Sequence, residues 1–151
     1  MRARASDPND PLKKRAAREG LVMVRREIVP STRRAHEAAE FARARGQLSP
    51  MHASLLRRYW TDGEDLYSFD TLRRAAEEVG LDPDELERAI EAGTYRPAVE
   101  ESVREAHELG IHAVPTFIFD GRLAVQGAQE LPVFQRAMRE LGVAPRSARP
   151  G

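Results

Sequence analysis

The chain has 151 residues, of which 41% are hydrophobic and 32% are charged, and it contains no cysteine. This length predicts one domain, and the composition is ordinary for a globular protein. Without cysteine, the chain can form no disulfide, thiolate metal site or cysteine nucleophile. No apolar run approaches the roughly 18 residues of a membrane span. The first residues, M-R-A-R-A-S-D-P, lack the apolar stretch of a secretory signal. We therefore predict no membrane partner and a cytoplasmic location.

The charges are unevenly distributed although the net charge is zero. Residues 1–60 hold 14 Lys and Arg against 6 Asp and Glu, whereas residues 61–151 hold 10 against 18. A basic half can indicate a surface for nucleic acid, or simply the solvated faces of helices. No aromatic or glycine residues are interleaved with the arginines as in a nucleic-acid groove. We therefore favour solvated helix faces and predict no nucleic-acid partner.

The N-terminal part begins with residues 1–11, which include Pro8, Pro11 and several polar side chains and are predicted to be a flexible lead-in. A short helix over residues 13–19 follows, and Gly20 ends it. The next passage, L-V-M-V-R-R-E-I-V-P, is apolar and ends at Pro30.

Helical periodicity dominates residues 31–110, and five helices are expected there. Ser31 or Thr32 can cap the first, and Ser49 caps the second with Pro50 at its first position. The third covers residues 69–79. A capping box that begins at Asp82 starts the fourth. Pro97 starts the fifth, which runs to Gly110. The side chains expected to face inward are, by helix, Ala35, Ala38, Ala39 and Ala42; Met51, Leu55, Leu56, Tyr59 and Trp60; Leu72, Ala75, Ala76 and Val79; Leu86, Ala89 and Ile90; and Val99, Val103 and Ala106.

The hydrophobic period changes after Gly110. Residues 116–119, T-F-I-F, are predicted to be a strand, and D-G is a hairpin turn that leads to a second strand over residues 123–125. A helix over residues 130–141 follows, with Phe134, Ala137, Met138 and Leu141 expected inward. The polar residues 143–151 are predicted to be a disordered tail.

The succession Gly110, V-P-T-F-I-F, D-G-R, V-x-G-A-Q and an amphipathic helix resembles the C-terminal half of a thioredoxin-like fold. With the upstream passages P-S-T-R-R-A-H-E-A-A-E-F-A, L-L-R-R-Y-W-T-D-G-E-D-L and A-G-T-Y-R-P-A-V, it resembles the DsbA family, in its FrnE-like branch near the 2-hydroxychromene-2-carboxylate isomerases. The resemblance covers residues 12–142. It implies a helical insertion over residues 31–110 and a C-terminal ββα part over residues 111–142.

The resemblance also implies a substrate-binding role for the V-P-T sequence. In that family the proline is cis and faces the active-site dithiol, and the residue before it binds an extended peptide through its backbone. Val114, Pro115 and Thr116 are the matching positions. Gln129 and His36 stand at nearby family-like positions without an assigned role. The residues alone favour an ordinary trans proline at a strand boundary, because cis bonds are rare.

The chain departs from the family pattern because it has no counterpart of the strand–Cys-x-x-Cys–helix–strand unit. The expected fold is therefore α/β, thioredoxin-like with a helical insertion, and its sheet is incomplete because the N-terminal βαβ unit is missing. Residues 116–119 would be an apolar, unpaired edge prone to associate. Either the gene is truncated, or another chain or a second copy completes the sheet.

The function implied by the resemblance is thiol–disulfide oxidoreduction, with no catalytic residue and no activity of this chain alone. The alternatives are a non-catalytic, chaperone-like module that binds extended or unfolded peptides, a gene remnant, and a degenerate isomerase. No cofactor is expected. No metal site is expected either, because the four histidines show no ligand spacing such as H-x-x-x-H.

Overall fold

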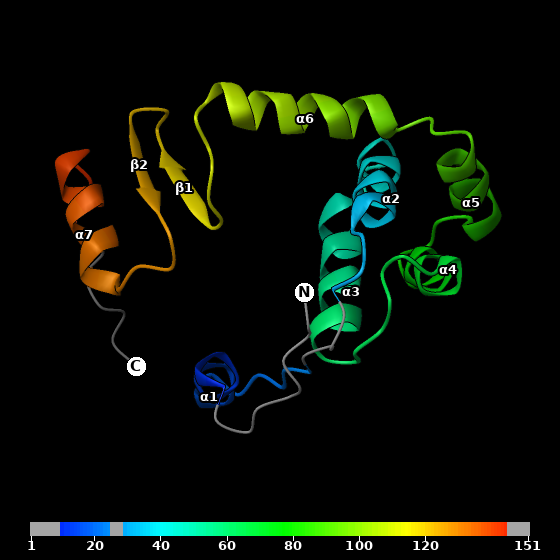
Figure 1. Ribbon diagram of the computed structural model, residues 1–151, viewed down its shortest axis with the longest axis horizontal. Helices are drawn as coiled ribbons and strands as arrows, with labels where there is room; N and C mark the ends of the chain where they lie inside the picture. The colour runs from blue at the N-terminus through cyan, green and yellow to red at the C-terminus, as the bar shows by residue number, and fades with distance from the viewer. Residues whose placement is uncertain (1–9, 25–28, 145–151) are drawn as a thin grey trace. The chain divides into compact units, whose positions relative to one another are not determined.

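The computed structural model describes residues 10–24 and 29–144, which contain seven helices and two strands (Figure 1). The elements are α1 Pro11–Arg18, α2 Arg33–Arg43, α3 Leu48–Trp60, α4 Phe69–Glu78, α5 Pro83–Glu91, α6 Arg96–Glu108, β1 Thr116–Phe119, β2 Leu123–Gln126 and α7 Leu131–Glu140. The chain divides into two compact units, Met1–Ser102 and Val103–Gly151, and the division falls inside α6. None of the described helices is long and apolar enough to cross a membrane.

Helix α1 begins two residues before the helix predicted over residues 13–19. Pro11 is already the first residue of α1, and the Asp10 side chain caps this helix by accepting a hydrogen bond from the Leu12 N–H at 2.9 Å. Proline suits this position because its fixed φ matches the helix and it lacks an N–H that would be unpaired there. The rest of the predicted lead-in, the middle of the apolar passage before Pro30, and the predicted tail from residue 145 onward lie outside the described residues.

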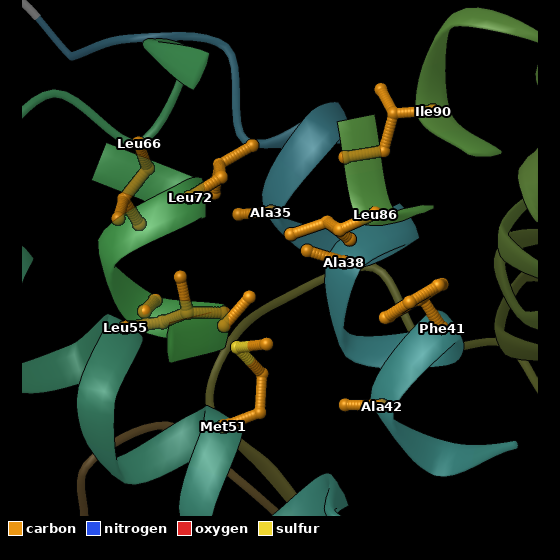
Figure 2. Packing of buried hydrophobic residues seen from close by; sticks show 12 residues of the cluster. Ala35, Ala38, Phe41, Ala42, Met51, Leu55, Leu66, Leu72, Leu86 and Ile90 are labelled. Atoms are coloured by element: carbon orange, nitrogen blue, oxygen red, sulfur yellow. The ribbon is translucent and has the colours of Figure 1, made fainter. Parts of the chain in front are cut away.

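The first unit is built on a core shared by α2, α3, α4 and α5. Phe41, Met51, Leu72 and Leu86, one from each helix, are at most 1% exposed and meet at its centre (Figure 2). The predicted alanine stripe of α2 is buried, as are the central residues of the predicted stripe of α4. Small side chains along α2 let the neighbouring helices approach closely. The buried faces predicted for α2 and for the centre of α4 are confirmed.

Helix α3 differs from the expectation in its first residue and in which of its side chains are buried. It begins at Leu48, so Ser49 and Pro50 lie within its first turn instead of capping it. Leu56, expected inward, is 58% exposed, whereas Arg58 on the same helix is only 8% exposed. The prediction for Leu56 was wrong, and the burial of Arg58 was not predicted, because a hydropathy pattern does not register ion pairs and hydrogen bonds.

Arg58 lies at the centre of a polar network on one side of this core. Its guanidinium donates to Ser54 Oγ at 3.2 Å, to Glu64 Oε1 at 3.1 Å and to Glu78 Oε2 at 3.0 Å. Burial raises the pKa of Glu64, but the Arg74 hydrogen bond and the charges of Arg58 and Arg74 together bring it below its usual value. The Ser54 hydrogen bond, followed by the Arg57 charge, lowers the pKa of Glu78.

The capping expected at the start of α5 is confirmed. Asp82 accepts hydrogen bonds from the backbone N–H groups of Asp84 at 2.8 Å and Glu85 at 3.1 Å, and Pro83 follows at the first helical position. The Glu85 carboxylate pairs with Arg45 of the neighbouring chain segment. The start of α5 is therefore stabilised both by its own N-cap and by an ion pair with a residue distant in sequence.

Helix α6 corrects another expectation. It starts at Arg96, one residue before the predicted Pro97, and none of its residues is buried. Val103, expected inward, is 52% exposed. The apolar stripe of α6 consists of small or short side chains flanked by charged residues, so it is too narrow to require burial on its own.

The second unit contains a β-hairpin and α7. β1 pairs antiparallel with β2, with Phe117 opposite Val125, and Asp120 and Gly121 form the turn at φ values of 54° and 62°. Two consecutive positive φ values are typical of a type I′ turn, which the Asp-Gly sequence favours. Phe134 of α7 lies edge-on to Phe117, at a centroid distance of 5.0 Å. The described residues are thus mostly helical, and their one sheet consists of two strands.

Candidate functional site: the cis-proline loop and the outer edge of β1

The loop between α6 and β1 presents its backbone to solvent at Val114. The Val114–Pro115 peptide bond is cis, and Val114 is 91% exposed. The Thr116 hydroxyl donates a hydrogen bond to the Ala113 carbonyl at 2.7 Å, which closes a short turn around the proline. Val114 is therefore displayed at the tip of a constrained turn directly before the strand.

A second set of hydrogen bonds fixes the other side of the proline. The Gly127 N–H donates to the Pro115 carbonyl at 2.7 Å, which extends the β1–β2 ladder past Thr116. Gly127 has a φ of 81°, a conformation that other residues rarely adopt. The Gln129 side chain donates to the Gln126 carbonyl at 2.9 Å. Gln129 thus stabilises the turn after β2 that supports the proline.

The register determines which backbone groups of β1 face away from β2. Because Pro115 bonds to Gly127, the alternation of an antiparallel ladder makes Phe117 and Phe119 the hydrogen-bonded residues of the strand. The N–H and C=O groups of Thr116 and Ile118 then point to the opposite edge. No further strand pairs with that edge among the described residues. The outer edge of β1 is therefore open next to the cis-proline loop.

An apolar hollow lies beside the same loop, within the second unit. It is lined by Val103, Ala106, His107, Ile111, His112, Ala113 and Val114. The end of α6 supplies one wall and the residues leading to the proline supply the other. The hollow can hold one apolar side chain of a ligand that follows the loop backbone.

The five residues selected from the sequence do not all fall in one place. Val114, Pro115, Thr116 and Gln129 belong to the second unit and are linked through the hairpin hydrogen bonds. His36 is an exposed residue of α2 in the first unit. The structure therefore gathers four of these residues in the second unit, whereas His36 belongs to the first.

The structural role of Gly127 and the hollow at the end of α6 were not predicted from the sequence. The glycine in V-x-G-A-Q was the available signal, since a glycine after a strand often marks a positive φ. The hollow had no sequence signal because it depends on how α6 ends beside the loop. Across the described parts of the chain, no group of three or more His, Asp or Glu side chains is arranged to hold a metal ion.

Comparison with known proteins identifies the family. The family model of the DSBA-like thioredoxin domain matches residues 3–139. The chain belongs to this family. The absence of cysteine from its sequence agrees with the expected lack of a Cys-x-x-Cys unit.

Two similar proteins show how much of a longer relative this chain covers. The crystal structure of a probable DsbA oxidoreductase from Streptomyces coelicolor is 30% identical and superposes with a TM-score of 0.77, covering 93% of this chain and 62% of that one. The uncharacterized protein YwbO of Bacillus subtilis (strain 168) is 30% identical over 112 residues, which are 74% of this chain and 56% of YwbO. The chain thus spans about three fifths of the length of both relatives.

Proposed function

We propose that this DSBA-like chain binds extended, unfolded polypeptide segments along the cis-proline loop and the outer edge of β1. The observation that carries the proposal is the exposed Val114 backbone, which leads directly into a strand with an open edge. A peptide added at such an edge gains main-chain hydrogen bonds and becomes an extra strand. Thr116 and Ile118 would supply those bonds, and the hollow near Ile111 would accept an apolar side chain of the peptide.

The chain itself would contribute binding and no redox chemistry. Thiol–disulfide exchange proceeds through a mixed disulfide formed by an attacking thiolate, and this chain contains no cysteine. We therefore propose that any DsbA-type oxidoreductase activity requires thiols supplied by another polypeptide that completes the sheet. A cytoplasmic location and the boundaries of the helical insertion at residues 31 and 110 stay predictions.

The direct test uses a permanently unfolded client, reduced and carbamidomethylated α-lactalbumin labelled with fluorescein, and measures its anisotropy with the full chain. Ile118→Pro removes one outward N–H from β1 and leaves the ladder to β2 intact, because proline is tolerated at a strand edge. We expect this variant to bind the client at least about fivefold more weakly, through the lost strand-addition bond.

The matched control is Ala124→Pro. Ala124 lies opposite Ile118, so its N–H also points outward, but from the far edge of β2. Client binding by this variant should stay close to that of the unchanged chain. Equal weakening by both substitutions, or no client binding by the unchanged chain, would contradict the proposed edge.

The open edge also favours a second role, association with another chain. Val114, Phe117 and Ile118 are each at least 40% exposed around that edge, and an apolar open edge tends to pair with further strands. We expect the mass measured by light scattering to exceed 16.9 kDa, and excess client to compete with this association. A monomer at all concentrations would contradict this second role and leave client binding to be judged separately. The isomerase alternative predicts glutathione binding, which the same preparation can test by calorimetry.

A further inference from the structure

A second hollow lies in the first unit. It is lined by residues from the start of α2, the segment before α4, the end of α5 and the start of α6, among them Arg33, Arg34, Glu37, Tyr67, Phe69 and Arg96. None of these residues has a part in the proposed function. The lining brings three guanidinium groups together with the buried carboxylate of Glu37 and with the carboxylate of Glu91.

Glu37 is the buried group. It is 2% exposed, and its Oε2 has no hydrogen-bond partner among the described residues. Its other oxygen, Oε1, lies 3.9 Å from Arg96 Nε, which is longer than a charge-assisted hydrogen bond. Buried carboxylate oxygens in proteins are normally satisfied by donors. Glu37 Oε2 is therefore a buried acceptor that the described residues leave unsatisfied, on a residue that lines the hollow.

The arginines form the other half of the hollow. Arg34 is held in place, since it donates to the Tyr67 carbonyl at 2.8 Å and its guanidinium carbon lies 3.9 Å from the Tyr67 ring centroid. Arg33 meets Glu100 at 3.4 Å, and both side chains are more than half exposed. Arg96 is 49% exposed. The long, solvated contacts of Arg33 and Arg96 can be exchanged for contacts with a bound anion.

We propose that this hollow binds a free α-amino acid. Its ammonium group donates to Glu37 Oε2, and its carboxylate pairs with the guanidinium groups of Arg33 and Arg96. A simple cation would have to pass three arginines, and a simple anion would be repelled by the buried carboxylate while leaving Oε2 without a donor. A zwitterion with adjacent opposite charges satisfies both halves. The rings of Phe69 and Tyr67 also line the hollow, each with the Arg34 guanidinium over one face, and they favour an apolar side chain on the ligand.

The test is a titration of the full ¹⁵N-labelled chain, followed by NMR, with L-phenylalanine, N-acetyl-L-phenylalanine and L-phenylalaninamide. The acetyl compound lacks the ammonium group and the amide lacks the carboxylate. We expect L-phenylalanine to shift the amides of Arg33, Tyr67 and Arg96. Both analogues should bind at least about tenfold more weakly, because each loses one charge-assisted contact.

Glu37→Gln should weaken L-phenylalanine binding at least about tenfold, since it removes the charge that faces the ammonium group. Glu40→Gln is the matched control on the same helix, because Glu40 pairs with Arg43 at 2.9 Å and does not line the hollow. If Glu37→Gln does not fold, Arg96→Gln, at a half-exposed position, should show the weaker binding instead.

Three results would overturn the inference. The first is the absence of any response to L-phenylalanine, which is expected if a water molecule alone satisfies Glu37. The second is equal affinity for N-acetyl-L-phenylalanine. The third is unchanged binding in both Glu37→Gln and Arg96→Gln. Each of these leaves the peptide-binding edge in the second unit untouched.

Discussion

The two units of this chain differ in how far their apolar side chains are buried. In the first unit, α2 to α5 enclose a continuous core that includes Phe41 and Met51, both fully buried. In residues 103–144, Val125 and Ala137 are the buried apolar side chains, while Val114 and Ile118 face solvent. Apolar burial is therefore concentrated in the first unit. The first unit supplies the packed core, and the second displays a strand edge and a constrained loop.

The largest effect is expected from the core of the first unit. Phe41→Ala should lower the free energy of unfolding by about 3–5 kcal/mol, because it removes a fully buried ring and leaves a cavity. Urea unfolding followed by circular dichroism measures this loss. Leu56→Ala, at a 58% exposed position of α3, is the control and should cost less than about 0.5 kcal/mol. Similar losses in both variants would show that the first unit has no specific core.

The polar network beside that core should have the next largest effect. Arg58→Met keeps the apolar stem but removes the charge that Glu64 and Glu78 face. It should lower the free energy of unfolding by about 2–3 kcal/mol. This is less than the loss expected for a fully buried pair, because Glu78 is partly exposed. Arg57→Met is the control, since Arg57 also pairs with Glu78 but is 46% exposed. An equal loss in the control would mean that burial of Arg58 adds nothing.

The same network predicts an acid dependence. Glu64 and Glu78 have pKa values lowered from about 4.5 in the folded chain. Their contribution is therefore fully present above pH 4.5 and is lost as the pH falls through the lower folded-state values. The stability of the first unit should fall below pH 4.5, and this fall should be shallower in Arg58→Met. A steeper fall in the variant would contradict the assignment.

In the second unit, Phe134→Ala should cost about 1–2 kcal/mol, because a half-buried ring loses its edge-on contacts with Phe117 and Phe119. Amide hydrogen exchange followed by NMR should show faster exchange in the hairpin and unchanged protection in α2 to α5. Leu131→Ala, at a 66% exposed position of α7, is the control. Equal acceleration in both units would show that they unfold as one.

The smallest effect is expected at Gly127. Gly127→Ala places a Cβ on a residue with a φ of 81° and should cost about 1 kcal/mol. Thermal unfolding of the second unit measures this change. Gly127→Asn should cost less, because asparagine tolerates positive φ better than alanine does. The reverse order of the two variants would mean that the backbone conformation is not the cause.

Most helices and both strands could be predicted from the sequence, because capping and turn residues agreed with the hydrophobic period in those segments. Asp82-Pro83 placed the start of α5, Asp-Gly placed the hairpin turn, and the alanines of α2 marked its buried face. The exceptions were residues whose burial depends on long-range partners. Arg58 is buried because Ser54, Glu64 and Glu78 surround it, and a hydropathy pattern does not contain that information.

The candidate sites likewise contain residues that a local motif locates and residues that only long-range contacts define. Val114 and Pro115 were located by the V-P-T-F motif, and their link to Gln129 follows from the register of one hairpin. The burial of the Glu37 carboxylate could not be predicted, because Arg96, which lies 3.9 Å from it, is distant in sequence. His36 looked equivalent to the other selected residues in sequence, yet it is an exposed residue of the first unit.

The central claim, that the outer edge of β1 receives an extended chain, is tested most directly by residue-resolved amide exchange of the full protein with and without carbamidomethylated α-lactalbumin. The account predicts that the client slows exchange at Thr116 and Ile118, whose N–H groups point outward, and leaves Ala124 and α2 to α5 unchanged. Protection at Ala124 or within the first unit, without protection at Ile118, would contradict it.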